Sequence, residues 1–212
     1  MTDLGRMSIA LIQGKKKDIT AMVQQALDDG IDAEVVLNDG LIPGMAVVGE
    51  RFRRNLIYVP EVLLSARAMK AGMAILEPIL ASSGVEPIGK IIMGTVKGDL
   101  HDIGKNLVGM MLQGAGYEII DLGTDVSAER FIAAIKEHGS KLLGMSALLT
   151  TTMPYMSKVV QAVKESGLSD VRTMIGGAPV TQKFATDIGA DGYAPDAASA
   201  VELAKQLYGV AV

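Results

Sequence analysis

The order of hydrophobic and polar positions divides the chain into two parts with different periodicities. In the first part, apolar residues recur at the three- and four-residue spacing of a helix face, in residues 15–30, 33–55 and 60–81. Gly30 is a stop signal, whereas Gly40 and Pro43 predict a break within the second segment. The positions that define the first and third faces are Ile19, Met22, Val23, Ala26, Val62, Leu63, Ala66, Met69, Met73 and Leu76. We expect a small bundle of four helices.

The second part alternates short apolar runs with amphipathic segments, after a linker at residues 82–87. The predicted strands are residues 90–96, 117–123, 141–146, 171–177 and 191–194. The predicted helices are residues 102–115, 127–138, 153–167, 181–188 and 197–208. Five βα units with right-handed crossovers make an α/β fold, a doubly wound parallel sheet in the flavodoxin-like order 2-1-3-4-5. We expect a helical domain over residues 1–84 and a Rossmann-like domain over residues 88–212.

Composition limits the classes of function. A net charge of −4 gives no electrostatic reason to expect nucleic acid or an anionic membrane as partner. The chain has no cysteine, which excludes disulfides and thiolate metal sites. The N-terminus does not resemble a signal peptide, and no window approaches a membrane span of about 20 apolar residues. We expect a cytoplasmic protein. Its 13 methionines are explained either by ordinary core packing or by an adaptable apolar surface.

Ligands of such sheets bind at the carboxyl ends of the strands, and the loop after the first strand carries Asp99, His101 and Asp102. The glycine spacing is wrong for a dinucleotide, and the aspartates would repel a pyrophosphate. A flavin phosphate would need hydroxyls, of which this loop has only Thr95. A phospho-receiver domain would need an aspartate where this chain has Ser146.

Three further interpretations concern His101 itself. A zinc site with Asp99 and Asp102 lacks a further ligand, because His138 is expected at the opposite edge of the sheet. A Ser–His–Asp hydrolase lacks the nucleophile elbow, and a helix-capping histidine would have no special role.

Two residues apart in an extended turn, Asp99 and His101 can point to the same side. The carboxylate would then fix the imidazole tautomer and orientation, which favours a single-ligand metal site completed by a cofactor.

The spacing Asp99-x-His101-x-x-Gly104, followed by Ser146-x-Leu148 and by Gly176-Gly177, resembles the signature of cobalamin-binding proteins. The chain is similar to the corrinoid module of methionine synthase, and more closely to the small corrinoid proteins of anaerobic methyltransferase systems. The resemblance covers nearly the whole chain, including its helical part.

The resemblance implies a cobalamin or related corrinoid bound base-off and His-on. His101 is then the lower axial ligand of cobalt, Asp99 is its hydrogen-bond partner, and Thr152 replaces the serine that completes this relay in methionine synthase. The implied positions along the nucleotide tail are Ser146, Leu148, Thr150, Gly176, Gly177 and Ala197, with Ala194 and Asp196 beside the last. The implied positions at the corrin edge are Gly98, Asp102, Ile103 and Gly104.

The helical domain is implied to cap the upper face of the corrin. Phe52 and Val59 correspond to apolar capping contacts, although plain bundle core is the alternative for both. Asn38 stands where relatives often have a carboxylate near the corrin.

The function implied is that of a methyl carrier in one-carbon metabolism, which is not itself an enzyme. Cobalt would carry a methyl group from a donor methyltransferase to an acceptor methyltransferase, both acting in trans, in a demethylation pathway for a methylamine or an O-methyl aromatic compound. A reductive activase is a further implied partner. The alternatives are a cobalamin-dependent sensor, the small subunit of a carbon-skeleton mutase, and a flavodoxin-like domain that binds no corrinoid.

Overall fold

The computed structural model describes residues 2–84 and 87–209. The chain divides into two compact units. One comprises Met1–Pro87 with Gly114–Gly116, and the other comprises Ile88–Gln113 with Tyr117–Val212.

The first unit consists of helices, several of which begin at a start signal in the sequence. The elements are α1 (Leu4–Ile12), α2 (Lys16–Asp28), α3 (Ala33–Val35), η1 (Val36–Leu41), α4 (Ile42–Arg53) and α5 (Val59–Ser82). Asp3 and Asp32 accept hydrogen bonds from the first turns of α1 and α3, and Pro60 stands at the start of α5. The buried positions of α2 and α5 include Ile19, Val23, Ala26, Val62, Ala66, Met69 and Leu76. Met22, Leu63 and Met73, which we predicted on the same faces, are only partly buried.

The predicted break at Gly40 and Pro43 is wrong, because α3, η1 and α4 follow one another without an interruption. Residues Val36–Leu41 form a π-helical turn that lengthens the helix by a residue instead of ending it. The hydroxyl of Ser8 donates to the carbonyl oxygen of Gly40 at 2.6 Å and holds this turn from the neighbouring helix. Pro43, which has no N–H to donate, stands directly after this π-helical turn, in the first turn of α4.

The second unit is a five-stranded parallel sheet in the order β2-β1-β3-β4-β5, which confirms the predicted α/β fold and strand order. The strands are β1 (Lys90–Thr95), β2 (Glu118–Asp121), β3 (Leu142–Ser146), β4 (Arg172–Gly176) and β5 (Gly192–Tyr193). The helices between and after them are α6 (Ile103–Gly114), α7 (Ala128–His138), α8 (Pro154–Glu165), α9 (Gln182–Ile188) and α10 (Ala197–Tyr208).

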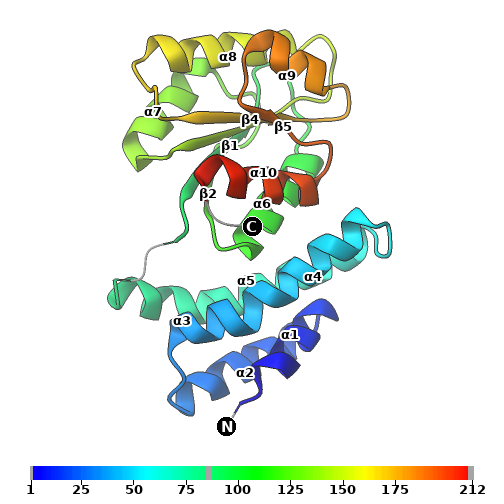
Figure 1. Ribbon diagram of the computed structural model, residues 1–212, viewed down its shortest axis with the longest axis vertical. Coiled ribbons are helices and arrows are strands. Elements are labelled where there is room, and N and C mark those ends of the chain that lie inside the picture. The colour runs from blue at the N-terminus through cyan, green and yellow to red at the C-terminus, as the bar shows by residue number, and fades with distance from the viewer. Residues whose placement is uncertain (1, 85–86, 210–212) are drawn as a thin grey trace. The chain divides into compact units, whose positions relative to one another are not determined.

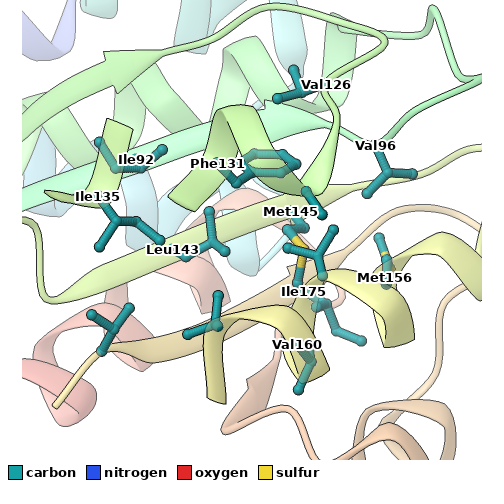
Figure 2. Packing of buried hydrophobic residues seen from close by; sticks show 14 of the residues in the cluster. Ile92, Val96, Val126, Phe131, Ile135, Leu143, Met145, Met156, Val160 and Ile175 are labelled. Carbon is teal, nitrogen blue, oxygen red and sulfur yellow. The ribbon is translucent and has the colours of Figure 1, made fainter. Parts of the chain in front are cut away.

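Helices cover both faces of this sheet. Figure 1 shows α7, α8 and α9 on one face and α6 and α10 on the other. The first face encloses a cluster of buried side chains, among which Ile92, Val96 and Phe131 pack together in Figure 2. Alternation along β1 therefore sends Ile91, Met93 and Thr95 to the opposite face, where α6 lies.

In the described residues, no helix is both long and apolar enough to cross a membrane.

Candidate functional site

The loop after β1 begins with a tight turn. The N–H of Asp99 donates to the carbonyl oxygen of Val96 at 3.1 Å, and Gly98, the third residue of the turn, has a φ of +86°. A positive φ at this position is what a type II turn requires, and glycine adopts it without strain. Gly98 therefore has a backbone reason to be glycine, and the turn lifts Asp99 and His101 onto the rim formed by the carboxyl ends of the strands.

Asp99 is the centre of the polar contacts at this rim. Its side chain is completely buried, and five donors lie within 3.1 Å of its two oxygens. Oδ1 accepts from the backbone N–H of His101 at 3.1 Å and lies 2.8 Å from His101 Nδ1. Oδ2 accepts from the backbone N–H groups of Leu148 and Leu149, at 2.8 and 3.1 Å, and from the Thr152 hydroxyl at 2.7 Å.

These contacts fix the charge state of Asp99. Burial alone raises the pKa of a carboxyl group, because it penalises the charged form. Here the hydrogen bonds from Thr152, Leu148 and His101 outweigh burial and hold the pKa of Asp99 well below its usual range. Asp99 is therefore a carboxylate, which accepts from all its neighbours and has no proton to give.

His101 has one ring nitrogen committed to Asp99 and the other available. The two-residue spacing predicted that the side chains of Asp99 and His101 meet, and the 2.8 Å contact between Oδ1 and Nδ1 confirms it. Because Asp99 is charged, Nδ1 carries the proton in the neutral imidazole, so Nε2 has the free lone pair. Half of the His101 side-chain surface is exposed, and no residue in 2–84 or 87–209 forms a hydrogen bond with Nε2.

Thr152 approaches the carboxylate and not the imidazole. Its Oγ1 lies 2.7 Å from Asp99 Oδ2 and 2.9 Å from the carbonyl oxygen of Leu149. A hydrolytic triad needs its nucleophile on the imidazole nitrogen that faces away from the carboxylate. Hydroxyl, carboxylate and imidazole therefore form a chain that ends at Nε2 of His101, and the geometry disfavours the hydrolase interpretation.

The remaining residues of the loop leave open, apolar surface beside His101. Leu100 and Ile103 are 73% and 80% exposed, the two highest values among the exposed large apolar side chains of the described residues. A methyl group added at Gly104 would meet no atom within 4 Å. Asp102 is turned toward α6, where Oδ2 accepts from Asn106 Nδ2 at 3.0 Å.

The two glycines after β4 are needed by the fold itself. Gly177 has a φ of +127°, and a Cβ there would lie 1.9 Å from the carbonyl oxygen of Ala147. At Gly176 a Cβ would lie 3.1 Å from the carbonyl oxygen of Ala194. The expectation that these glycines make room for a ligand therefore has a competing reason, the close approach of neighbouring backbone. Ala197 is buried at the start of α10, beyond the cap formed by Asp196.

The other predicted site residues are more scattered. Ser146 pairs with Thr95 across β3 and β1, and Thr150 is exposed in the loop after β3. In the helical unit, Phe52 is partly buried, while Val59 and Asn38 are exposed. Val59 is therefore not plain bundle core. The roles predicted for these residues stay predictions.

Sequence reasoning missed two parts of the site. The Thr95 hydroxyl, considered only for a flavin phosphate, donates to the carbonyl oxygen of His101 at 2.8 Å. Asp125, from the loop after β2, accepts from the N–H of Gly98 at 2.7 Å and donates its own N–H to the carbonyl oxygen of Asp99 at 3.0 Å. No local pattern in the sequence points to Asp125, because its positive φ of 54° is a property of the folded chain.

The rim thus presents one oriented imidazole nitrogen, Nε2 of His101, beside exposed apolar side chains. Among residues 2–84 and 87–209, no group of three or more histidine, cysteine, aspartate or glutamate side chains could hold a metal ion. The zinc interpretation therefore lacks a ligand set in this part of the chain. A single oriented imidazole can hold a metal whose other ligands belong to a cofactor, and the exposed leucine and isoleucine side chains would offer that cofactor apolar contacts.

Comparison with known proteins agrees with this geometry. Residues 89–202 match the family described as "B12 binding domain", and residues 4–77 match a second family of the same description. The chain is 44% identical to a corrinoid protein of Desulfitobacterium hafniense, over 99% of both chains, and 43% identical to the dimethylamine corrinoid protein of Methanosarcina barkeri, over 96% of both.

Among solved structures, the methanol:cobalamin methyltransferase complex of Methanosarcina barkeri contains a similar chain. Its TM-score is 0.85 at 32% identity, covering 97% of this chain and 79% of that one. The fold, the histidine loop and these relatives together show that the chain belongs to the B12-binding family and, within it, to the corrinoid proteins of methyltransferase systems.

Proposed function

We propose that this chain binds a corrinoid base-off and His-on, and carries a methyl group between two partner enzymes. The observation that supports the proposal most directly is the His101 imidazole. Its Nδ1 is bonded to a buried carboxylate, while Nε2 is free on a half-exposed ring. When bound, the corrinoid supplies a cobalt ion that accepts a methyl group and gives it up again.

The chain's own contribution is to orient the ligand and tune it. Asp99 holds the tautomer in which Nε2 of His101 has the lone pair for a metal, and the Thr152 hydroxyl stabilises the carboxylate by a further hydrogen bond. Leu148 and Leu149 donate backbone N–H groups to the same carboxylate, so the side chain that orients His101 is itself held by the loop after β3.

The remaining predicted site residues are proposed as the binding surface of the cofactor. Residues assigned to the nucleotide tail are Ser146, Leu148, Thr150, Gly176, Gly177 and Ala197. Residues assigned to the corrin edge are Gly98, Asp102, Ile103 and Gly104. Residues assigned to the cap over the upper face are Asn38, Phe52 and Val59. The exposure of Val59 and Asn38 supports the last assignment, because a cap needs contacts that the helical unit does not use internally.

We infer that the partners are a donor methyltransferase, an acceptor methyltransferase and a reductive activase, and that the chain alone does not turn over. A methylated amine is the proposed donor, ahead of an O-methyl aromatic compound, because relatives 43% and 41% identical are named dimethylamine and trimethylamine corrinoid proteins. Each donor would be recognised on its own partner enzyme.

Electron paramagnetic resonance of the cobalt(II) holo-protein tests the ligand assignment. A nitrogen ligand on the axial position splits the cobalt lines, and we expect this splitting in the natural protein and its loss in His101→Ala. The chain provides a matched control, since His138 is its only other histidine and lies at the end of α7. His138→Ala should keep the splitting. If the splitting persists in His101→Ala, the axial assignment is wrong.

The donor is tested separately. Purified holo-protein in the cobalt(I) state is mixed with candidate methyltransferases and either methylamines or O-methyl aromatic compounds, and loss of the cobalt(I) absorption is followed. Demethylation of an O-methyl aromatic compound with no response to any methylamine would contradict the proposed donor while leaving the carrier function intact.

A further inference from the structure

The Thr95 hydroxyl is buried at a position where the fold itself has no need of one. Thr95 is the last residue of β1, is completely inaccessible to solvent and faces the side of the sheet covered by α6. A valine has nearly the same shape and suits a buried strand at least as well. Burying a hydroxyl costs free energy unless it finds a partner, and the partner here is the carbonyl oxygen of His101, at 2.8 Å.

Thr95 is itself held firmly on both sides. Its N–H donates to the carbonyl oxygen of Gly123 at 2.9 Å, and its carbonyl oxygen accepts from the N–H of Val126 at 3.0 Å. On its other side Thr95 is paired in register with Ser146 of β3. Val126 is buried beside Val96 in the core, as Figure 2 shows. The hydroxyl is therefore a fixed point on the rigid part of the sheet.

His101 is contacted by hydrogen bonds from two side chains of the loop and the strand before it. Asp99 Oδ1 accepts from its backbone N–H and contacts its ring, while Thr95 holds its carbonyl oxygen. Neither Asp99 contact reaches the carbonyl group of His101. The Thr95 hydroxyl is the side-chain group that holds this carbonyl, one residue before Asp102, which is itself bonded to Asn106 of α6.

We propose that Thr95 is a positioning residue for His101: its buried hydroxyl fixes the His101 main chain so that the ring meets Asp99 and presents Nε2 to the cofactor. This inference rests on the proposed function for the identity of the ligand that His101 contacts. It concerns only residues of this chain, so it can be tested in protein without cofactor as well as with it.

The decisive variants are Thr95→Val, which keeps the shape and removes the hydroxyl, and Thr95→Ser, which keeps the hydroxyl and removes the methyl group. Thr173→Val is the matched control. Thr173 is also a buried strand threonine whose hydroxyl is bonded, to Asp191, but it lies at the opposite end of the sheet. It reports what the loss of any buried threonine hydroxyl does to the fold.

The first measurement uses cofactor-free protein, with the imidazole ring of His101 observed by nitrogen-15 nuclear magnetic resonance. In Thr95→Val we expect the Nδ1 signal to shift away from its hydrogen-bonded position. In Thr95→Ser and Thr173→Val it should stay. An unchanged His101 signal in Thr95→Val would overturn the proposal, whatever the protein's stability.

The second measurement is cobalt(II) paramagnetic resonance of the holo-proteins. Loss of one hydrogen bond should reduce the ratio of nitrogen-ligated to unligated cobalt about five-fold in Thr95→Val, with recovery in Thr95→Ser. An unchanged ratio in Thr95→Val would contradict the proposal. Absence of nitrogen splitting in the natural protein would instead overturn the proposed function, and the cofactor-free measurement would still decide the role of Thr95. Should Thr95→Val not fold, Thr95→Cys, whose thiol is a weak donor, replaces it in both measurements.

Discussion

The loops that follow β1 and β4 reach the same rim of the sheet but are held by opposite means. The loop after β1 is fixed by polar side chains, with Asp99 accepting from five donors and Thr95 holding His101. The loop after β4 is held by backbone contacts so close that they leave no room for a side chain, because at Gly177 even a methyl group would collide with the backbone of Ala147. A substitution can remove the hydrogen bonds of the first loop one at a time, whereas any side chain added at Gly177 would collide with neighbouring backbone. The two loops should therefore respond to substitution in different ways.

Gly177→Ala should have the largest effect, and it should appear without cofactor. The new Cβ would lie 1.9 Å from a carbonyl oxygen and require a φ of +127°, so we expect a loss of more than about 4 kcal/mol in the free energy of unfolding. Denaturant unfolding of the cofactor-free protein measures this. Gly176→Ala should cost less, because its Cβ would lie 3.1 Å from the carbonyl oxygen of Ala194. If the cofactor-free Gly177→Ala protein has normal stability and only loses corrinoid binding, the glycine serves the nucleotide tail and not the fold.

Asp99→Asn should be the most costly change in the loop after β1. In asparagine an NH₂ group replaces either Oδ1 or Oδ2. That NH₂ group would face the hydrogen-bond donors that now point at the oxygen, so buried donors would be left without an acceptor. We expect a loss of about 1–3 kcal/mol in the free energy of unfolding, with loss of nitrogen splitting in the cobalt(II) spectrum. Asp102→Asn is the matched control, because Asp102 contacts only Asn106 through its side chain within the described residues. Equal losses in the two variants would contradict the central place of Asp99.

Acid should weaken this loop through the same carboxylate. The pKa of Asp99 is lower in the folded protein than the ordinary value of about 3.9 in an unfolded chain, so the unfolded state binds the proton first as the pH falls. The stability from Asp99 is fully present above the unfolded pKa and is lost as the pH falls from there through the folded pKa. Its steepest contribution is about 1.4 kcal/mol per pH unit.

The measurement is the free energy of unfolding between pH 6 and pH 3 in the natural protein and in Asp99→Asn, under conditions where folding is reversible. The difference between the two proteins should shrink as the pH falls below about 4. A difference that stays constant over this range would mean that Asp99 is not the carboxylate with the lowered pKa.

Gly104→Ala should give the smallest effect on the fold and an effect of the opposite sign. No atom lies within 4 Å of the added methyl group, and alanine favours the helix over glycine by up to about 1 kcal/mol, so the cofactor-free protein should become slightly more stable. Corrinoid affinity, measured by absorption titration, should fall if the open space belongs to the cofactor. Unchanged affinity would show that the space beside His101 is not occupied by the corrin.

The sequence predicted much of the sheet unit, because periodicity there follows the local chain. All five strands lie within the predicted segments, and the predicted helix starts near 127, 153, 181 and 197 lie within a residue or two of those observed. The helical unit was less predictable at Gly40, where glycine and proline usually end a helix. A π-helical turn, held from the side by Ser8, carries the helix through instead, and no local pattern announces such a contact.

The candidate site divides in the same way. The Asp99–His101 contact could be predicted, because two residues in an extended turn place their side chains on one side whatever surrounds them. The other contacts of Asp99 come from residues 49 to 53 positions later, and Thr95 and Asp125 act through the ends of different strands. The order of the strands in the sheet brings these groups together, and that order cannot be predicted from any single segment of the sequence.

The sequence by itself therefore determined the two kinds of periodicity, the alternation of strands and helices, and an imidazole two residues from a carboxylate at a strand end. Only the tertiary structure decided that the carboxylate is buried and charged, that His101 is held at its carbonyl by Thr95, and that Gly177 is needed by neighbouring backbone. The physical reason is range. Periodicity and side-chain alternation depend on bonds between neighbouring residues, whereas burial, pKa and close backbone approach depend on which distant segments the parallel sheet places side by side.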